Sequence, residues 1–205
     1  MLVQRNDVSP IVARDARIAE SAHVIGNVLI GEGCVVGHGA VIESSGPEVR
    51  LDAGVVVMSG AVVRSLGGVH RPAFPVRVGA ETCVGPLAAL AGCLIEDACY
   101  VATGVMVFQD VVVGEGTRLG AGSIVHVGTR LPPASRVGLR HYAVPGEDGA
   151  AVITADVDEA RRHLAGADFF GHVFDADGQA DLAALHRRTT AILRAEAAGW
   201  TDRVL

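Results

Sequence analysis

The chain has 205 residues, a net charge of −6 and no cluster of lysine and arginine, which argues against a nucleic-acid partner. No apolar run approaches the roughly 18 residues that a membrane helix needs, and residues 1–10 lack the apolar core of a signal peptide. The four cysteines include no CxxC pair. We therefore expect them to be small apolar core residues in a reducing compartment, without a disulfide or metal role. We therefore expect a cytoplasmic protein without a membrane or nucleic-acid partner.

A period of six residues begins after a lead-in at residues 1–10. Branched aliphatic residues mark this period at Val12, Ile18, Val24, Ile30, Val36 and Ile42. A nine-residue step then leads to Leu51, and the period resumes through Val57 and Val63, with Val69 as a further candidate. The next residues, 70–77, contain two prolines and no period, so they predict a loop that leaves the repeating structure.

The period is longest between Val78 and Val137, with a single five-residue step from Leu90 to Ile95. Small residues stand four places after most of the aliphatics. Glycine often follows the aliphatic directly, as at Gly85, where we expect it to allow backbone angles that a Cβ would resist. Such short repeats predict a solenoid. The expected fold is an all-β solenoid, a left-handed parallel β-helix of hexapeptide repeats over residues 11–140, with about six to seven triangular coils.

Residues 141–205 predict a turn-rich exit followed by helices. Residues 154–165 have the composition of a short helix, with Thr154 or Asp156 as its cap. Residues 181–198 repeat apolar side chains at helical spacing and predict an amphipathic helix. We expect this helix to lie along the prism or a neighbouring subunit and to cover apolar surface.

The repeats resemble those of γ-class carbonic anhydrases. The segment IGEGCVVGHGAVIESSGPEVRLDAGVVVMSGAVVR is similar to the front half of that family, including Gly46-Pro47, the nine-residue step and Gly60. The segment VGAETCVGPLAALAGCLIEDACYVATGV is similar to the family's later repeats, including the five-residue step. The resemblance covers residues 11–140. It implies a homotrimer in which three histidines from two subunits hold a zinc-type ion.

The family's three metal ligands fall here on Arg64, Pro86 and Ala91. None of these side chains can bind a metal ion, because alanine and proline carry no donor atom and a guanidinium stays protonated. The family's Arg-Gly-Asp falls on residues 43–45, and its Gln-Asp pair falls on Met58 and Ser59. We therefore expect no metal and no hydration of CO2 by the family mechanism.

Two of the replacements introduce opposite charges, Glu43 and Arg64. Each directly follows an inward aliphatic, so they are expected to stack about 4.8 Å apart on neighbouring strands. One interpretation is a structural ion pair at a subunit interface. The other is an anion site in which Arg64 holds the substrate and Glu43 orients it or acts as a base. The cleft between subunits would be lined by Met58, Ser59, Arg64, Pro86, Ala91 and Phe108.

A metal site relocated to the histidines would need ligands at an unusual sequence spacing. His38, His70 and His126 lie in the repeats or the loop, and no HxH or HxxxH pair occurs among them. The sequence favours surface histidines over ligands. From the cleft and the loop we take four residues as catalytic candidates. They are Arg64, Glu43, Ser59 and His70.

Three functions follow from these patterns. The first is a trimeric protein whose metal-free cleft binds or converts a small anionic metabolite without a cofactor. The second is acyl transfer with CoA or acetyl-CoA, in which His70 is the general base. The third is a non-catalytic scaffold or assembly subunit that binds through its outer faces and terminal helix.

Overall fold

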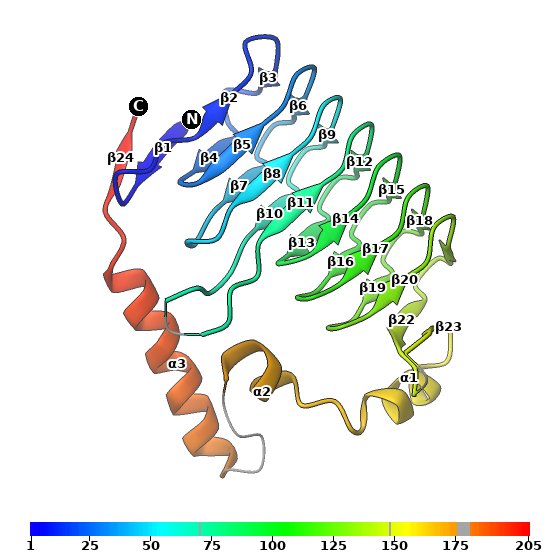
Figure 1. Ribbon diagram of the computed structural model, residues 1–205. Helices are drawn as coiled ribbons and strands as arrows, with labels where there is room; N and C mark the ends of the chain where they lie inside the picture. The colour runs from blue at the N-terminus through cyan, green and yellow to red at the C-terminus, as the bar shows by residue number, and fades with distance from the viewer. Residues whose placement is uncertain (70, 148, 176–180) are drawn as a thin grey trace.

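The computed structural model describes residues 1–69, 71–147, 149–175 and 181–205. Short strands wind around the three flat faces of a prism (Figure 1). Each coil adds one strand to each face, and neighbouring strands pair in parallel except at the two ends of one sheet. The predicted parallel β-helix is therefore present.

In the described residues the first face holds ten strands and the other two hold seven each. The first face contains β1 (Leu2–Arg5), β4 (His23–Ile25), β7 (Val41–Glu43), β10 (Val62–Arg64), β13 (Ala89–Ala91), β16 (Met106–Val107), β19 (Ile124–Val125), β22 (Tyr142–Pro145), β23 (Ala151–Thr154) and β24 (Asp202–Val204). The second face contains β2 (Ile11–Val12), β5 (Val28–Ile30), β8 (Val49–Leu51), β11 (Val76–Val78), β14 (Leu94–Ile95), β17 (Val112–Val113) and β20 (Arg130–Leu131). The third face contains β3 (Arg17–Ile18), β6 (Val35–Val36), β9 (Val56–Val57), β12 (Cys83–Val84), β15 (Tyr100–Val101), β18 (Arg118–Leu119) and β21 (Arg136–Val137).

The aliphatics that set the period fill the prism. Ile42, Leu90, Ile95 and Leu119 are among the largest fully buried side chains. Burying one such side chain contributes about 1.5–3 kcal/mol, so the repeat itself supplies the driving force for coiling. Val69 does not continue the period, because it is exposed and lies in the loop between β10 and β11.

The glycines that follow the aliphatics are needed for a reason other than the special backbone angles that we expected. At Gly85 the backbone does not adopt a positive φ. A Cβ there would instead lie 2.7 Å from Ala102 C and from Val101 O, in the next coil. Glycine is needed at this position because neighbouring coils approach closely, and left-handed angles occur at other glycines such as Gly104, with φ +67°.

The prism extends beyond residues 11–140 at both ends. β1 pairs in parallel with β4, where Val3 is the register partner of Ile25, so residues 2–5 of the expected lead-in belong to the first face. At the other end, β22 pairs in parallel with β19, and β23 then adds an antiparallel edge.

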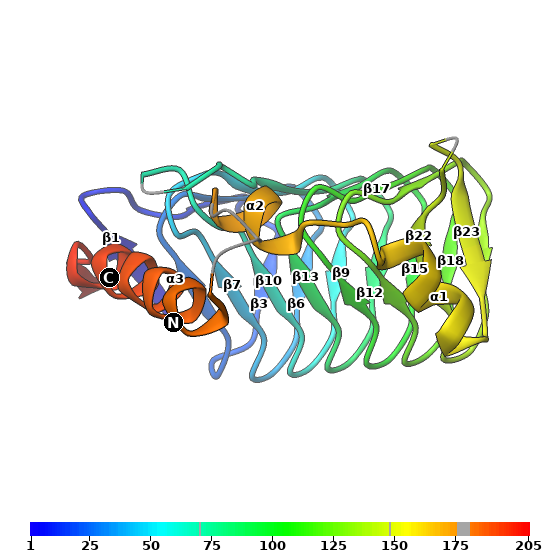
Figure 2. The same cartoon turned by 90° about the horizontal axis from the view of Figure 1, so that it is seen from below.

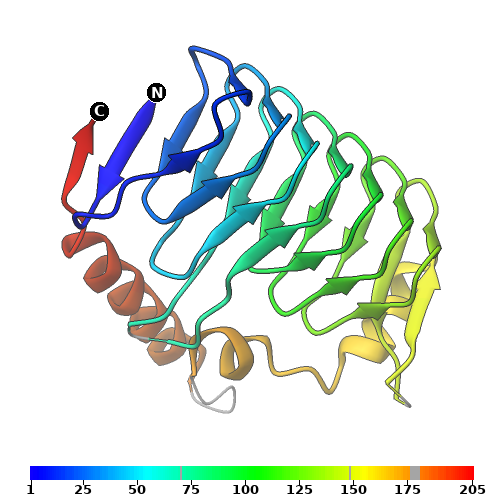
Figure 3. The same cartoon turned by 45° about the horizontal axis from the view of Figure 1, so that its top comes forward.

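The tail contains three helices, α1 (Val157–Leu164), α2 (Phe169–Phe174) and α3 (Leu182–Ala198). Asp156 caps α1, as one of the two expected candidates, by accepting hydrogen bonds from Asp158 N and Glu159 N. The tail returns along the prism from its last coil to its first (Figure 2). There β24 pairs antiparallel with β1, so that the two strands lie side by side (Figure 3).

The helix expected over residues 181–198 is α3, and it buries Leu185 in an apolar cluster within the same chain. This cluster, separate from the prism core, joins the loop, the turn after β19, α2 and α3. Its buried members are Leu66, Phe74, Val127, Val173, Phe174 and Leu185.

Candidate functional site

Strand pairing on the first face arranges three of the replaced residues, Glu43, Arg64 and Ala91, in one outward column. Arg64 pairs with Glu43 on one side and with Ala91 on the other. Phe108 and His126 continue the column, because they follow the paired residues Val107 and Val125. The stacking of Glu43 and Arg64 on neighbouring strands is therefore as expected from the hexad count.

Glu43 pairs chiefly with Arg5, not with Arg64. Arg5 Nη1 lies 2.6 Å from Glu43 Oε1, whereas Arg64 Nη2 lies 3.9 Å from Glu43 Oε2. Arg5 is buried, and it also contacts both carboxylate oxygens of Asp202, at 2.7 and 2.8 Å. The ion pair expected between Glu43 and Arg64 is thus the weaker of the two, and the sequence analysis missed Arg5 because it placed residues 1–10 outside the prism.

The guanidinium of Arg64 is incompletely paired. Its Nε is buried and has no hydrogen-bond partner among the described residues. The side chain is 39% exposed, so solutes can reach its outer nitrogens. Arg5 and Arg64 together balance the two carboxylates Glu43 and Asp202, and the contact of Arg64 with Glu43, at 3.9 Å, is the longest among them.

Within one chain, the expected cleft residues fall on opposite ends of the first-face strands. Met58, Ser59 and Pro86 lie in turns that follow β9 and β12 and precede the first-face strands β10 and β13. These turns stack, because Leu87 N donates to Ser59 O at 3.2 Å. Arg64 comes at the far end of β10. A single subunit therefore does not bring the six residues together.

Ala91 and Phe108 face the chain's own tail. Both pack against the apolar cluster that includes Val173 and Phe174 of α2. The ring of Phe108 also lies 5.6 Å from the ring of His126, centroid to centroid. The apolar replacement Ala91 thus accommodates the tail, and Phe108 contributes to intrachain packing.

The residues aligned with the family's ligands do not fit a metal ion, as Arg64, Pro86 and Ala91 offer no lone pair to it. Over residues 1–69, 71–147, 149–175 and 181–205, no three His, Cys, Asp or Glu side chains group so as to hold one. His38 Nδ1 lies 3.0 Å from Ser21 Oγ, on the corner of the prism. His70, the expected general base of acyl transfer, lies outside the described residues.

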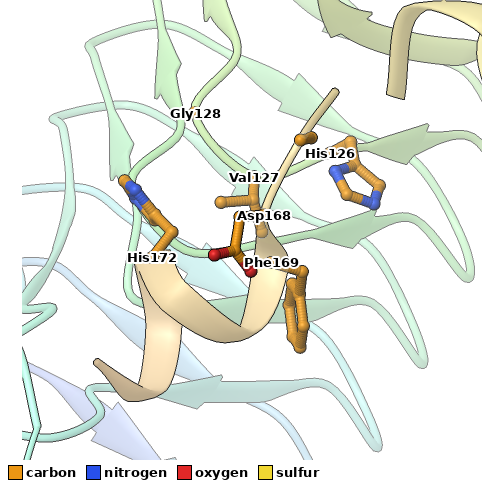
Figure 4. A pocket seen from close by; sticks show the side chains of 7 residues that line it. His126, Val127, Gly128, Asp168, Phe169 and His172 are labelled. Atoms are coloured by element: carbon orange, nitrogen blue, oxygen red, sulfur yellow. The ribbon is translucent and has the colours of Figure 1, made fainter. Parts of the chain in front are cut away.

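A cavity of about 360 Å³ lies beside the column, between the turn after β19 and α2 (Figure 4). It is lined by His126, Val127, Gly128, Ala167, Asp168, Phe169 and His172. Burial lowers the pKa of His126 below its ordinary value of 6.5. The Nδ1 atom of this ring is buried without a hydrogen-bond partner in the described structure. The sequence analysis considered His126 only as a metal ligand or surface residue, since no local pattern places it against α2.

Comparison with known proteins identifies sequence relatives. No protein-family profile matches the chain. Gamma carbonic anhydrase 2, mitochondrial, of Arabidopsis thaliana is 32% identical over 127 residues, which are 62% of this chain and 46% of that protein. The bifunctional protein GlmU of Prochlorococcus marinus is 30% identical over 152 residues, 74% of this chain and 28% of that protein. The matched regions span less than half of these relatives.

A solved structure of a hexapeptide transferase family protein from Anaplasma phagocytophilum superimposes with a TM-score of 0.50. The match covers 95% of this chain and 93% of that one, at 17% identity. At this identity the likeness shows the fold alone, and it confirms the left-handed β-helix. The described part of the chain contains no helix with the length and apolarity to cross a membrane. The cytoplasmic location stays a prediction, because the plant relative is named mitochondrial.

These findings confirm the resemblance that the repeats predicted. The chain is a left-handed β-helix of hexapeptide repeats and is similar in sequence to γ carbonic anhydrases.

Proposed function

We propose that this protein is a homotrimer that binds a small anion at Arg64 without a metal ion, and that it does not hydrate CO2. The observation that carries the proposal is the incomplete pairing of Arg64. Its Nη2 is 3.9 Å from a carboxylate that Arg5 already holds at 2.6 Å, and its side chain is 39% exposed, so an anion can approach the outer nitrogens.

A guanidinium in this state suits a planar anion. Its fork of N–H donors matches a carboxylate or bicarbonate with two parallel hydrogen bonds. The neighbouring Glu43 would repel a second anion, which favours a ligand with one charged group. Arg5 holds Glu43 in place, so Glu43 acts as a fixed charge that orients the guanidinium of Arg64. We do not propose Glu43 as a base.

The trimer is proposed because a single chain separates the cleft residues. The turns that carry Ser59 and Pro86 precede the first-face strands, and Arg64 ends one of them. Packing this corner of one subunit against the strand ends of another would place all three near one cleft. Exposed apolar side chains at the turns and on the first face, Met58, Leu87 and Met106, support an interface there.

CO2 hydration is not proposed for a chemical reason. In metal-dependent hydration the ion lowers the pKa of bound water from 15.7 to about 7 and so supplies hydroxide. Arg64, Pro86 and Ala91 cannot hold such an ion. The remaining side chains of the column are Glu43, Phe108 and His126, and over the described residues no three His, Cys, Asp or Glu side chains group so as to hold a metal ion.

The test is anion binding by the full chain and by two variants. Bicarbonate, acetate and phosphate are titrated against wild type, Arg64→Ala and Arg64→Lys, with thermal stability and calorimetry as readouts. We expect at least one anion to bind the wild type, at least tenfold weaker binding in Arg64→Ala, and partial recovery in Arg64→Lys. Arg118→Ala, which removes the same charge from the third face, is the matched control and should bind as wild type does.

The same samples test the other parts of the proposal. Elemental analysis of protein purified without a histidine tag should find no stoichiometric zinc, and CO2 hydration should equal the buffer rate. Light scattering should give three times the mass of the 21.1 kDa chain. Bound zinc with hydration activity would overturn the proposal, as would anion binding that Arg64→Ala leaves unchanged.

Two other functions give different results in these experiments. Acyl transfer predicts stabilisation by CoA or acetyl-CoA that Arg64→Ala retains, and loss of turnover in His70→Ala. A scaffold predicts a trimer that no anion or CoA stabilises.

A further inference from the structure

The cavity beside α2 is chemically distinct from the Arg64 site. Its walls are mainly apolar, from Val127, Ala167 and Phe169, and its volume of about 360 Å³ lies at the small end of ligand pockets. The polar groups in the lining are His126, Asp168 and His172. In Figure 4, His126 comes from the turn after β19, whereas Asp168 and His172 belong to the α2 segment.

The charge of the lining favours a cation. Asp168 is the N-cap of α2 and accepts one hydrogen bond, from Gly171 N at 2.8 Å. A carboxylate has about four acceptor positions, so capping leaves capacity for a ligand. The other acid near the cavity, Asp110, is already engaged by Arg130 at 2.6 Å and by His172 at 3.2 Å. Asp168 is therefore the anionic group of the cavity that no such pair compensates in the described structure.

His126 is the second polar side chain of the lining. Burial favours the neutral imidazole, in which one ring nitrogen is a hydrogen-bond acceptor. Its Nδ1 atom is buried and makes no hydrogen bond to the described residues.

We propose that this cavity binds a small primary amine with an apolar or aromatic body. The ammonium group pairs with Asp168, and the body packs on Phe169 and Val127 beside the neutral ring of His126. An aromatic face also attracts a nearby cation, which adds to the preference for an amine over an acid. This site does not depend on Arg64 or on the proposed anion.

Three probes with one ring and different head groups test the proposal, namely benzylamine, benzyl alcohol and benzoate. Binding is followed on the full chain by calorimetry and by the imidazole resonances of His126. We expect benzylamine to bind at least tenfold more tightly than benzoate, to shift the His126 resonances, and to bind Arg64→Ala as it binds wild type. Equal or tighter binding of benzoate would overturn the proposal.

Two variants test separately whether binding needs the negative charge of Asp168 and whether it needs the volume of the cavity. Asp168→Asn keeps a good N-cap but removes the charge, so it should abolish the preference of benzylamine over benzyl alcohol. Asp158→Asn, on the exposed first turn of α1, is its control. Ala167→Trp should block all three probes, while Ala165→Trp, outside the lining, should not. Benzylamine binding that survives Ala167→Trp would place the amine elsewhere and refute the site.

Discussion

Arg5 and Asp202 lie 197 residues apart in the sequence and form a two-pronged ion pair. Arg5 Nε is 2.7 Å from Asp202 Oδ1, and Nη2 is 2.8 Å from Oδ2. The same guanidinium lies 4.0 Å from the centre of the Trp200 ring and 2.6 Å from Glu43. One arginine thus joins the first strand, the column on the first face and the end of the tail.

Replacing Asp202 by alanine should destabilise the protein by about 1–2 kcal/mol in urea unfolding. The charge-assisted hydrogen bonds are lost, but the loss is moderated because Asp202 is 41% exposed and Arg5 keeps Glu43. Asp158→Ala, which breaks the exposed pair with Arg161, should cost less than about 0.5 kcal/mol. Equal costs for the two variants would contradict the special position of Arg5.

The same pair predicts a pH dependence. The hydrogen bonds from Arg5 lower the pKa of Asp202 below its ordinary value of 3.8. A carboxyl whose folded-state pKa is lowered stabilises the fold above pH 3.8, and that stability is lost as pH falls through the lowered value. Urea unfolding of wild type and Asp202→Asn should therefore differ at pH 6 and converge at the lowest pH at which the protein folds.

A second ion pair, between Arg71 and Glu196, is buried and fixes the loop onto α3. Arg71 Nε lies 2.7 Å from Glu196 Oε1, and the two side chains are 2% and 7% exposed. Removing one partner leaves a buried charge, so Arg71→Ala and Glu196→Ala should each cost about 3–5 kcal/mol. The double change Arg71→Met with Glu196→Leu should recover most of this loss. A cost below 1 kcal/mol for Arg71→Ala would show that the loop does not rely on the pair.

Substitutions at Gly104 and Gly85 distinguish the stability cost of a left-handed backbone angle from the cost of steric crowding. Gly104 has φ +67° and no atom within 4 Å of an added Cβ, so Gly104→Ala should cost about 1–2 kcal/mol and Gly104→Asn less. At Gly85 the Cβ would press on the backbone of the next coil, so both Gly85→Ala and Gly85→Asn should cost about 3 kcal/mol. Thermal unfolding of the four variants measures the difference. Rescue by asparagine at Gly85 would contradict the explanation by close approach.

The cysteines should differ in reactivity. Cys34, Cys93 and Cys99 are buried, and burial raises the pKa of the Cys93 thiol to about 12. Cys83 is half-buried, although burial raises its pKa as well. Since the thiolate is the reactive form, iodoacetamide at pH 8 should modify Cys83 slowly and the other three only in denaturant. Peptide mapping by mass spectrometry reads out each site, and rapid native labelling of Cys93 would contradict the burial.

The prism was predictable because each core residue occupies an equivalent place in a short repeat. Ile42, Leu90 and Leu119 can be assigned to the interior from their spacing alone. The cap of α1 was predictable as far as two candidates, Thr154 and Asp156, because capping is local: the hydrogen bonds of Asp156 reach only two and three residues ahead.

The parts that escaped prediction depend on contacts between distant segments. No local pattern links Arg5 to Asp202, or Arg71 to Glu196, 125 residues away. Likewise Phe108 was assigned to a subunit cleft because its large side chain must point outward, but the tail that covers it starts far along the chain. The stacking of Glu43 on Arg64 followed from the hexad count, whereas the competing arginine did not.

The return of the tail to β1 alters how the solenoid is expected to unfold. A linear array of coils contacts only nearest neighbours, so either end can fray without affecting the other. Here β24 is attached to the first coil, while α1 and β23 adjoin the last. We therefore expect loss of the first coil to weaken the anchoring of the tail, which also packs on the middle of the prism through α2, so that fraying at one end affects the rest. A repeat architecture that would otherwise melt gradually becomes a single cooperative unit.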